Sequence, residues 1–386
     1  VSSGYDGQIT LVSGECEPPY NRVLLPEVLG GTLDEASLQL TDPSWYAESG
    51  IDLHLSTRVT AFDPERGRVF LNSGRSLRFD RLVLATGSIV PMDRIPGVTK
   101  HGVSVFRSLA DTRNLQSLIG CDGAVTIVGG GLLGLETAQS FLDCGSRVRV
   151  LHRRAHLLNR QLDETAAGIV QRHLERLGVR FSLGRQLSAI TGTDRVTGVV
   201  LDDGSEFAAD AVVFATGTCP EDGLARQAGL ACDHGVVVDE RLETSARGIY
   251  AIGECARVCG RSDALVAPVN RQAEVLAVNL CGGDAKYSPL PEVIRLKVRG
   301  IDVYCAGASC GAEEDPVLME DADRGIYRRL NFTGDVLTGA ILVGDSAGSR
   351  GIRQLIVDAT PIADRAAVAF GHVQDGRVLP VLRSAA

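Results

Sequence analysis

The sequence predicts an α/β fold made of two similar halves, followed by a small α+β domain. Three observations support this fold class. A glycine-rich turn at 129–134 joins an apolar strand to a helix. A pattern within 68–87 returns within 198–217. After about residue 291, the pattern changes to one expected for an antiparallel hairpin and a helix.

Length and composition define the protein class. The chain has 386 residues, which is enough to bury more than one core. Its net charge of −9 argues against nucleic acid or an anionic membrane surface as a partner. Ten cysteines form no C-x-x-C pair, so neither a thioredoxin-type dithiol nor a metal site is expected. Without a signal peptide or an apolar run of membrane-spanning length, the chain is expected to be cytoplasmic.

An internal repeat organises the chain. Gly74 matches Gly204 and Gly87 matches Gly217, and the members of both pairs lie 130 residues apart. Each copy predicts a β-hairpin that turns at a glycine, followed by a buried strand. The two buried strands end in Ala85-Thr86-Gly87 and Ala215-Thr216-Gly217.

The turn at 129–134 has the spacing of a dinucleotide-binding site. Gly129 makes the tight turn, Gly131 lets the backbone approach a pyrophosphate, and Gly134 lets the helix pack on the sheet. The helix N-terminus, which begins at Leu132 and Leu133, favours phosphate.

The next strand ends about 20 residues later, where an acidic residue would normally hold an NAD ribose. The chain has His152, Arg153 and Arg154 there. Arginine binds phosphate through a rigid fork of donors, so the site is predicted to prefer NADPH, with NADH possible. The alternative is that the arginines are an exposed surface pair.

The first half carries two acidic residues at strand ends. The repeat offset places the first glycine turn before residue 1, so we expect the first βα unit of this half to be missing and the sequence to be a fragment. A predicted strand at 8–12 ends near Glu15, where a ribose acid belongs. A second, predicted over 248–255, ends in Gly253 and Glu254, where ligands bind in open α/β sheets. An ordinary turn is the alternative for this pair.

These motifs together carry a family resemblance. The chain resembles the FAD- and NAD(P)H-binding N-terminal part of assimilatory nitrite reductase large subunits, within the two-dinucleotide-fold flavoproteins of the pyridine nucleotide–disulfide oxidoreductase type. The resemblance implies two Rossmann-like domains that bind FAD and NAD(P)H. The segments that carry it are 15–25, 85–87, 129–136, 215–217, 250–256, 265–268 and 326–345.

The resemblance also implies roles for individual residues. Glu15 would bind the adenosine ribose of FAD, Arg22 the pyrophosphate and Glu254 the ribityl chain. Glu136 would lie near the nicotinamide–flavin contact, and no acid–base residue is required because the cofactors carry the chemistry. One departure is that Pro26 and Glu27 stand where many related ferredoxin reductases carry Ser-Lys near the flavin.

The predicted domains follow from the repeat and the resemblance. The FAD-binding domain takes 1–108 and 227–290, the NAD(P)-binding domain 109–226, and the C-terminal α+β domain 291–386. In the last domain we expect a hairpin of 326–332 with 336–343 and then a helix that buries Ile352, Leu355, Ile356 and Ala359.

The predicted function is a flavoprotein reductase of nitrite or nitrate assimilation. Hydride would pass from NADPH to FAD, and electrons would pass to an iron–sulfur acceptor on a separate protein or a missing C-terminal module. Alternatives are a ferredoxin- or rubredoxin-type NAD(P)H reductase, a disulfide or peroxide reductase using Cys16, and a flavin-free NADPH-binding module. A homodimer is one possible assembly, which the sequence does not decide.

Overall fold

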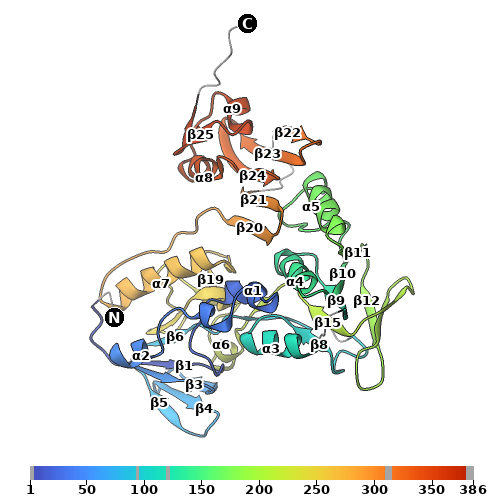
Figure 1. The fold of residues 1–386 in the computed structure, drawn as a ribbon. Coiled ribbons are helices and arrows are strands. Elements are labelled where there is room, and N and C mark those ends of the chain that lie inside the picture. Colours follow the sequence, from blue (N-terminus) through green and yellow to red (C-terminus); the bar gives the residue numbers. More distant parts are fainter. Residues whose placement is uncertain (1–3, 93–94, 119–121, 309–314, 380–386) are drawn as a thin grey trace. The chain divides into compact units, whose positions relative to one another are not determined.

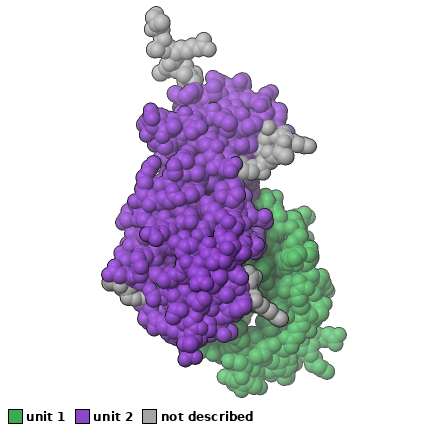
Figure 2. All heavy atoms as spheres, turned by 90° about the vertical axis from the view of Figure 1, so that its right-hand side faces the viewer, with its two compact units in different colours: residues 1–23, 34–91, 218–289 green, residues 24–33, 92–217, 290–386 purple. Residues whose placement is uncertain are grey.

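The computed structural model describes residues 4–92, 95–118, 122–308 and 315–379. The chain divides into two compact units (Figure 2). Unit 1 comprises residues 1–23, 34–91 and 218–289, and unit 2 comprises 24–33, 92–217 and 290–386. The predicted domain boundaries at 108, 226 and 290 stay predictions.

Unit 2 contains a parallel sheet in the strand order β11-β10-β9-β15-β8 (Figure 1). β9 and β15 lie in its interior and are almost wholly buried, as expected for strands covered on both faces. The predicted strand–turn–helix is present, since β9 leads into α4 and then into β10. The elements are α1 (Leu25–Leu29), β8 (Val103–Val105), α3 (Leu109–Leu118), β9 (Ala124–Val128), α4 (Leu132–Asp143), β10 (Arg147–His152), α5 (Glu164–Arg176), β11 (Arg180–Leu183) and β15 (Ala211–Phe214).

The repeat has a structural counterpart in both units. β3, β4 and β5 form an antiparallel sheet in unit 1, and β12, β13 and β14 form another in unit 2. Val69 pairs with Leu77 in the first sheet, and Val199 pairs with Phe207 in the second, again 130 residues later. The elements are β3 (Val59–Asp63), β4 (Arg68–Leu71), β5 (Ser76–Arg78), β12 (Leu187–Thr191), β13 (Gly198–Leu201) and β14 (Glu206–Ala208).

Most of the remaining strands of unit 1 form parallel pairs, whereas β7 and β16 pair antiparallel. β1 pairs with β2, β6 with β18, and β17 with β19, and a shared apolar core lies beneath the last two pairs. The strand predicted over 248–255 is shorter than expected, because it ends at Ala251 and gives way to a 3₁₀ turn. The elements are β1 (Ile9–Val12), α2 (Ser44–Glu48), β2 (Ile51–His54), β6 (Leu82–Leu84), β7 (Ser88–Ile89), β16 (Cys219–Pro220), α6 (Gly223–Gln227), β17 (Val236–Val238), β18 (Ile249–Ala251), β19 (Ala256–Val258) and α7 (Val266–Leu280).

The C-terminal part of unit 2 is an antiparallel sheet in the order β20-β21-β24-β23-β22. The predicted hairpin is present as β23 and β24, and α8 buries Ile352, Leu355 and Ile356. Ala359 differs from the prediction, since it caps the end of α8 in a left-handed conformation. The elements are β20 (Val293–Val298), β21 (Ile301–Gly307), β22 (Val317–Asp321), β23 (Ile326–Thr333), β24 (Val336–Val343), α8 (Ser349–Asp358), α9 (Arg365–Ala369), β25 (Val373–Gln374) and β26 (Arg377–Val378).

Candidate functional sites

Gly129 and Gly134 are fixed by close backbone packing where β9 turns into α4. Gly129 has a φ of +129°, and a Cβ on it would lie 2.1 Å from the carbonyl oxygen of Ala215. A Cβ on Gly134 would lie 2.0 Å from the carbonyl oxygen of Gly129. No side chain fits at these distances. Glycine at both positions therefore allows β9, β15 and α4 to approach one another closely.

Gly131 differs from these two glycines because a Cβ on it would have no atom within 4 Å. It is the N-cap of α4, and no side chain caps the helix there. Leu132 and Leu133 follow in the first turn and are partly exposed. The helix therefore begins beside open space, an arrangement that suits a phosphate group.

His152 braces this glycine turn from the end of β10. The Gly130 amide donates a hydrogen bond to His152 Nδ1 at 3.1 Å, and Nε2 lies 3.2 Å from Asn159 Oδ1. An accepting Nδ1 carries no proton, so the hydrogen-bond network assigns a neutral ring with its proton on Nε2. Burial also lowers the pKa of His152, which favours the neutral form. The structure thus gives His152 a supporting position, while Arg153 and Arg154 after it are exposed.

The two Ala-Thr-Gly segments follow β6, which pairs in parallel with β18, and β15, an interior strand of the parallel sheet of unit 2. In unit 2, Ala215 is buried beside Gly129, and Thr216 and Gly217 are exposed. In unit 1, Ala85 and Thr86 are exposed and Gly87 is half-buried. Both segments thus bring backbone and small side chains to the carboxyl end of a parallel strand.

Glu221 fixes the segment after β6. Its amide donates to the Gly87 carbonyl at 2.9 Å, and its carbonyl accepts from Thr86 Oγ1 at 2.6 Å. β7 and β16 pair directly beyond these bonds.

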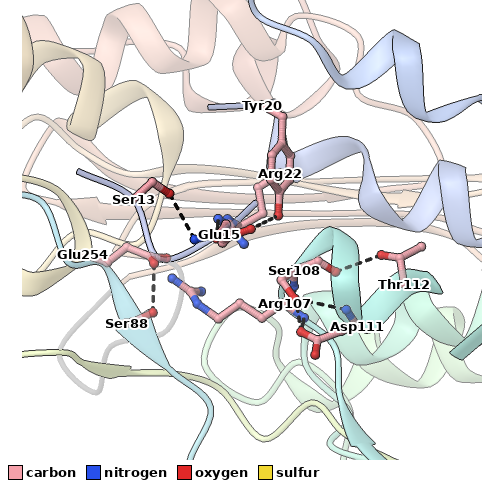
Figure 3. A network of polar contacts seen from close by, with 10 residues as sticks. All are labelled: Ser13, Glu15, Tyr20, Arg22, Ser88, Arg107, Ser108, Asp111, Thr112 and Glu254. Carbon is pink, nitrogen blue, oxygen red and sulfur yellow. Dashed lines mark hydrogen bonds and ion pairs between the residues drawn. The ribbon is translucent and has the colours of Figure 1, made fainter. Parts of the chain in front are cut away.

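Glu15 lies after β1 in a cluster with two neighbours (Figure 3). Tyr20 donates from its hydroxyl to Glu15 Oε2 at 2.7 Å, and Arg22 donates to Glu15 Oε1 at 2.6 Å. The Arg22 guanidinium also lies over the Tyr20 ring, 4.9 Å from its centroid. About a third of each charged side chain is exposed. The predicted ribose acid and pyrophosphate base are therefore neighbours, joined as an ion pair.

Glu254 is held by Ser88, whose hydroxyl donates to Glu254 Oε2 at 2.8 Å (Figure 3). Its neighbour Gly253 has a φ of +78°, and the Gly253 amide donates to Gln272 Oε1 at 2.7 Å. Gln272 lies on α7 and is completely buried. The turn at Gly253 and Glu254 is thus fixed through the Glu254 side chain and through the Gly253 backbone.

A buried network continues from Gln272. Gln272 Nε2 and the Tyr287 hydroxyl both donate to Asp263 Oδ2, at 3.4 Å and 2.7 Å. Burial and the bond to Asp263 raise the pKa of Tyr287 to about 12, so the phenol stays protonated. Ser88, Gln272, Asp263 and Tyr287 are not among the residues predicted from the sequence. A polar Gln272 four residues before the buried Leu276 on one helix face was the available signal.

Glu136 lies on α4 and contacts β20. Its Oε1 accepts a hydrogen bond from the Lys297 backbone amide at 3.1 Å. Burial raises the pKa of Glu136 to about 7. The charge of Glu136 is therefore expected to change near neutral pH.

The described residues contain no group of three or more His, Cys, Asp or Glu side chains arranged to hold a metal ion. The cysteines in the described ranges, Cys16 among them, form no disulfide bond. No helix in the part of the chain that the structure describes has the length and apolar character needed to cross a membrane.

Comparison with known proteins decides the family. The model of pyridine nucleotide-disulphide oxidoreductases matches residues 2–274, more than half of the chain. The chain belongs to the pyridine nucleotide-disulphide oxidoreductase family. The model of the rubredoxin NAD+ reductase C-terminal domain matches residues 293–360 of this pyridine nucleotide-disulphide oxidoreductase.

Two relatives come from Bacillus subtilis (strain 168). An NAD(P)H nitrite reductase is 37% identical over 365 residues, covering 94% of this chain and 45% of the relative. An assimilatory nitrate reductase electron transfer subunit is 35% identical over 341 residues, covering 88% of this chain and 44% of the relative. The chain thus spans less than half the length of these two proteins.

Solved structures give the same fold. The covalent putidaredoxin reductase–putidaredoxin complex contains a chain that matches with a TM-score of 0.88 and 26% identity, over 95% of this chain and 92% of that one. These matches confirm the predicted family, the two-dinucleotide-fold architecture and the class of FAD-dependent NAD(P)H oxidoreductase. FAD and NAD(P)H are the cofactors that this family implies. The roles of individual site residues stay predictions.

Proposed function

We propose that this chain is the NAD(P)H-oxidising flavoprotein part of an electron-transfer system for nitrite or nitrate assimilation. The single observation that carries the proposal is the close-packed turn at Gly129 and Gly134, with open space at Gly131 beside the start of α4. The relatives named nitrite reductase and nitrate reductase electron transfer subunit support the pathway.

The residues of unit 2 suit a dinucleotide. Gly131 and the first turn of α4 would hold the pyrophosphate. Arg153 and Arg154 are exposed directly after β10, and their guanidinium groups suit the 2′-phosphate of NADPH. This charge supports NADPH over NADH as the preferred donor.

The residues of unit 1 suit FAD. Glu15 and Arg22 would hold the ribose and the pyrophosphate, and Glu254, positioned by Ser88 and by the Gly253–Gln272 bond, would hold the ribityl chain. FAD, when bound, accepts two electrons as hydride and can release them singly. The protein contributes binding and alignment of the two rings.

Spectroscopy tests the proposal. The purified chain is expected to show flavin absorbance bands that NADPH bleaches without oxygen. A colourless protein that still binds NADPH would favour the flavin-free module. Retained disulfide reduction that is lost in Cys16→Ser would favour the disulfide reductase.

A ferredoxin- or rubredoxin-type reductase is the second candidate, because residues 293–360 match the rubredoxin NAD+ reductase C-terminal domain. Reduction rates of ferredoxin, rubredoxin, cytochrome c and nitrite, measured side by side, distinguish the two. We expect an iron–sulfur protein to be reduced fastest and nitrite not to be reduced by this chain alone.

A further inference from the structure

Three elements of unit 2 meet at a small polar cavity of about 160 Å³. α1 contributes Glu27, α4 contributes Glu136, Gln139 and Asp143, and β20 contributes Lys297. α1 is anchored to α4 because Ser140 Oγ donates to the Pro26 carbonyl at 2.7 Å. The cavity thus brings together charges from helices that are about 110 residues apart and a strand from the C-terminal part of the chain.

Lys297 connects the two glutamates of this cavity. Its backbone amide donates to Glu136 Oε1 at 3.1 Å, and its ammonium donates to Glu27 Oε1 at 3.2 Å. One residue of β20 therefore contacts a carboxylate on each helix.

Two polar atoms that belong to residues of this cavity lack a hydrogen-bond partner. Glu27 Oε2 is buried without a hydrogen-bond partner, and so is Gln139 Oε1. Burial raises the pKa of Glu136 to about 7, the charge of Glu27 acts in the same direction, and the amide and charge of Lys297 oppose it. Asp143, the other acid of the cavity, is paired with Arg299 at 3.2 Å.

Glu27 adds negative charge from α1 beside Glu136, and Lys297 supplies positive charge from β20. A base on a third element thus balances the acids of the two helices.

We propose that Lys297 is a positioning residue that orients Glu136. The positive charge of Lys297 and the opposing negative charge of Glu27 together set the fraction of Glu136 that is ionised. This proposal rests on the proposed function, in which Glu136 lies near the nicotinamide. A hydride leaves NADPH with two electrons, so the nicotinamide ring becomes cationic. An ionised Glu136 stabilises that positive charge, whereas a protonated one does not. Hydride transfer is therefore expected to accelerate as pH rises through the pKa of Glu136.

Opposite charge changes provide the test. Lys297→Met removes the ammonium but keeps the backbone amide, so it raises the pKa of Glu136 by about one unit. Glu27→Gln removes a like charge and lowers the pKa by a similar amount. Lys297→Arg keeps the positive charge and should stay near wild type. Lys286→Met and Glu240→Gln are matched controls, since this exposed pair, 3.0 Å apart, lies in unit 1.

Two readouts separate this proposal from the proposed function. The carboxyl ¹³C shift of Glu136, assigned through Glu136→Gln, reports its titration without requiring turnover. Anaerobic bleaching of the flavin by NADPH reports the pH profile of hydride transfer. Shifts of opposite sign in both readouts, with neither control shifting, are the expected result.

Other outcomes discriminate equally well. Unchanged titration in both variants, or shifts of the same sign, overturns the proposal. If Lys297→Met fails to fold, a comparison of Glu27→Gln with Lys297→Arg still tests the proposal. Only Glu27→Gln should shift the titration of Glu136. The titration of Glu136 could shift in opposite directions in the two variants while NADPH fails to bleach the flavin. That outcome would support the effect of Lys297 and Glu27 on Glu136 and reject the proposed function.

Discussion

The backbone amide of Gly130 donates a hydrogen bond to Nδ1 of His152, 22 residues further along the chain. The amide of Gly253 likewise donates to Gln272, 19 residues away. In both units, a predicted ligand-binding turn is held by a side chain from an element later in the chain. The shape of each turn thus depends on residues with no required contact to a ligand.

Replacing His152 should weaken the binding of both pyridine nucleotides equally. His152→Ala leaves the Gly130 amide without its acceptor, which makes the turn less ordered and raises Kd for NADPH and NADH by about tenfold. Titration calorimetry with each nucleotide measures this. His152→Asn, which restores an acceptor, should recover part of the loss. A loss confined to NADPH would instead place His152 at the 2′-phosphate.

Replacing the two arginines should affect only one nucleotide. Arg153→Ala with Arg154→Ala removes the charge-assisted hydrogen bonds proposed for the 2′-phosphate, so KM for NADPH rises by about tenfold or more. KM for NADH should change by less than about twofold. Steady-state kinetics with both donors measures the effect, and equal increases would refute the predicted preference.

Local motifs could be predicted from the sequence because their spacing reports backbone geometry. The turn at Gly129 and the hairpin pairs at Val69 and Val199 follow from glycine positions and strand alternation. The Glu136–Lys297 contact joins residues 161 positions apart, and nothing in the local pattern of either segment indicates it. The strand predicted to reach Cys255 ends early because Gly253 adopts a positive φ and starts a new turn.

Removing the buried amide of Gln272 should loosen the acidic turn of unit 1. Gln272→Leu preserves most of the volume but leaves the Gly253 amide without its partner and removes one of the two hydrogen bonds to Asp263 Oδ2. The free energy of unfolding should fall by about 2 kcal/mol, and Kd for FAD should rise. Urea unfolding and flavin fluorescence measure the two effects. Gln227→Leu, on the exposed face of α6, should change neither.

The raised pKa of Glu136 predicts how stability depends on pH. The folded chain holds the Glu136 proton up to about pH 7, whereas the ordinary value is 4.5. Between these values the folded state binds more protons, so this group lowers stability as pH rises. Glu136→Gln should therefore raise the free energy of unfolding at pH 8 by on the order of 2 kcal/mol, and little at pH 4. Exposed Glu274→Gln is the control, and an equal gain at both pH values would contradict the prediction.

Substitutions at Gly131 and Gly134 should distinguish an effect on folding from an effect on nucleotide binding. Gly134→Ala places a Cβ 2.0 Å from the Gly129 carbonyl oxygen, so α4 must move away from β9, and stability should fall by about 3 kcal/mol. Gly131→Ala meets no atom within 4 Å and has an extended backbone at φ −87°, so its Tm should stay near that of wild type. The added methyl group nevertheless occupies the space proposed for the pyrophosphate. We expect Gly131→Ala to weaken NADPH and NADH binding by tenfold or more, about 1.4 kcal/mol, in a folded protein. Thermal melts beside nucleotide titrations test this, and unimpaired binding in folded Gly131→Ala would place the pyrophosphate elsewhere.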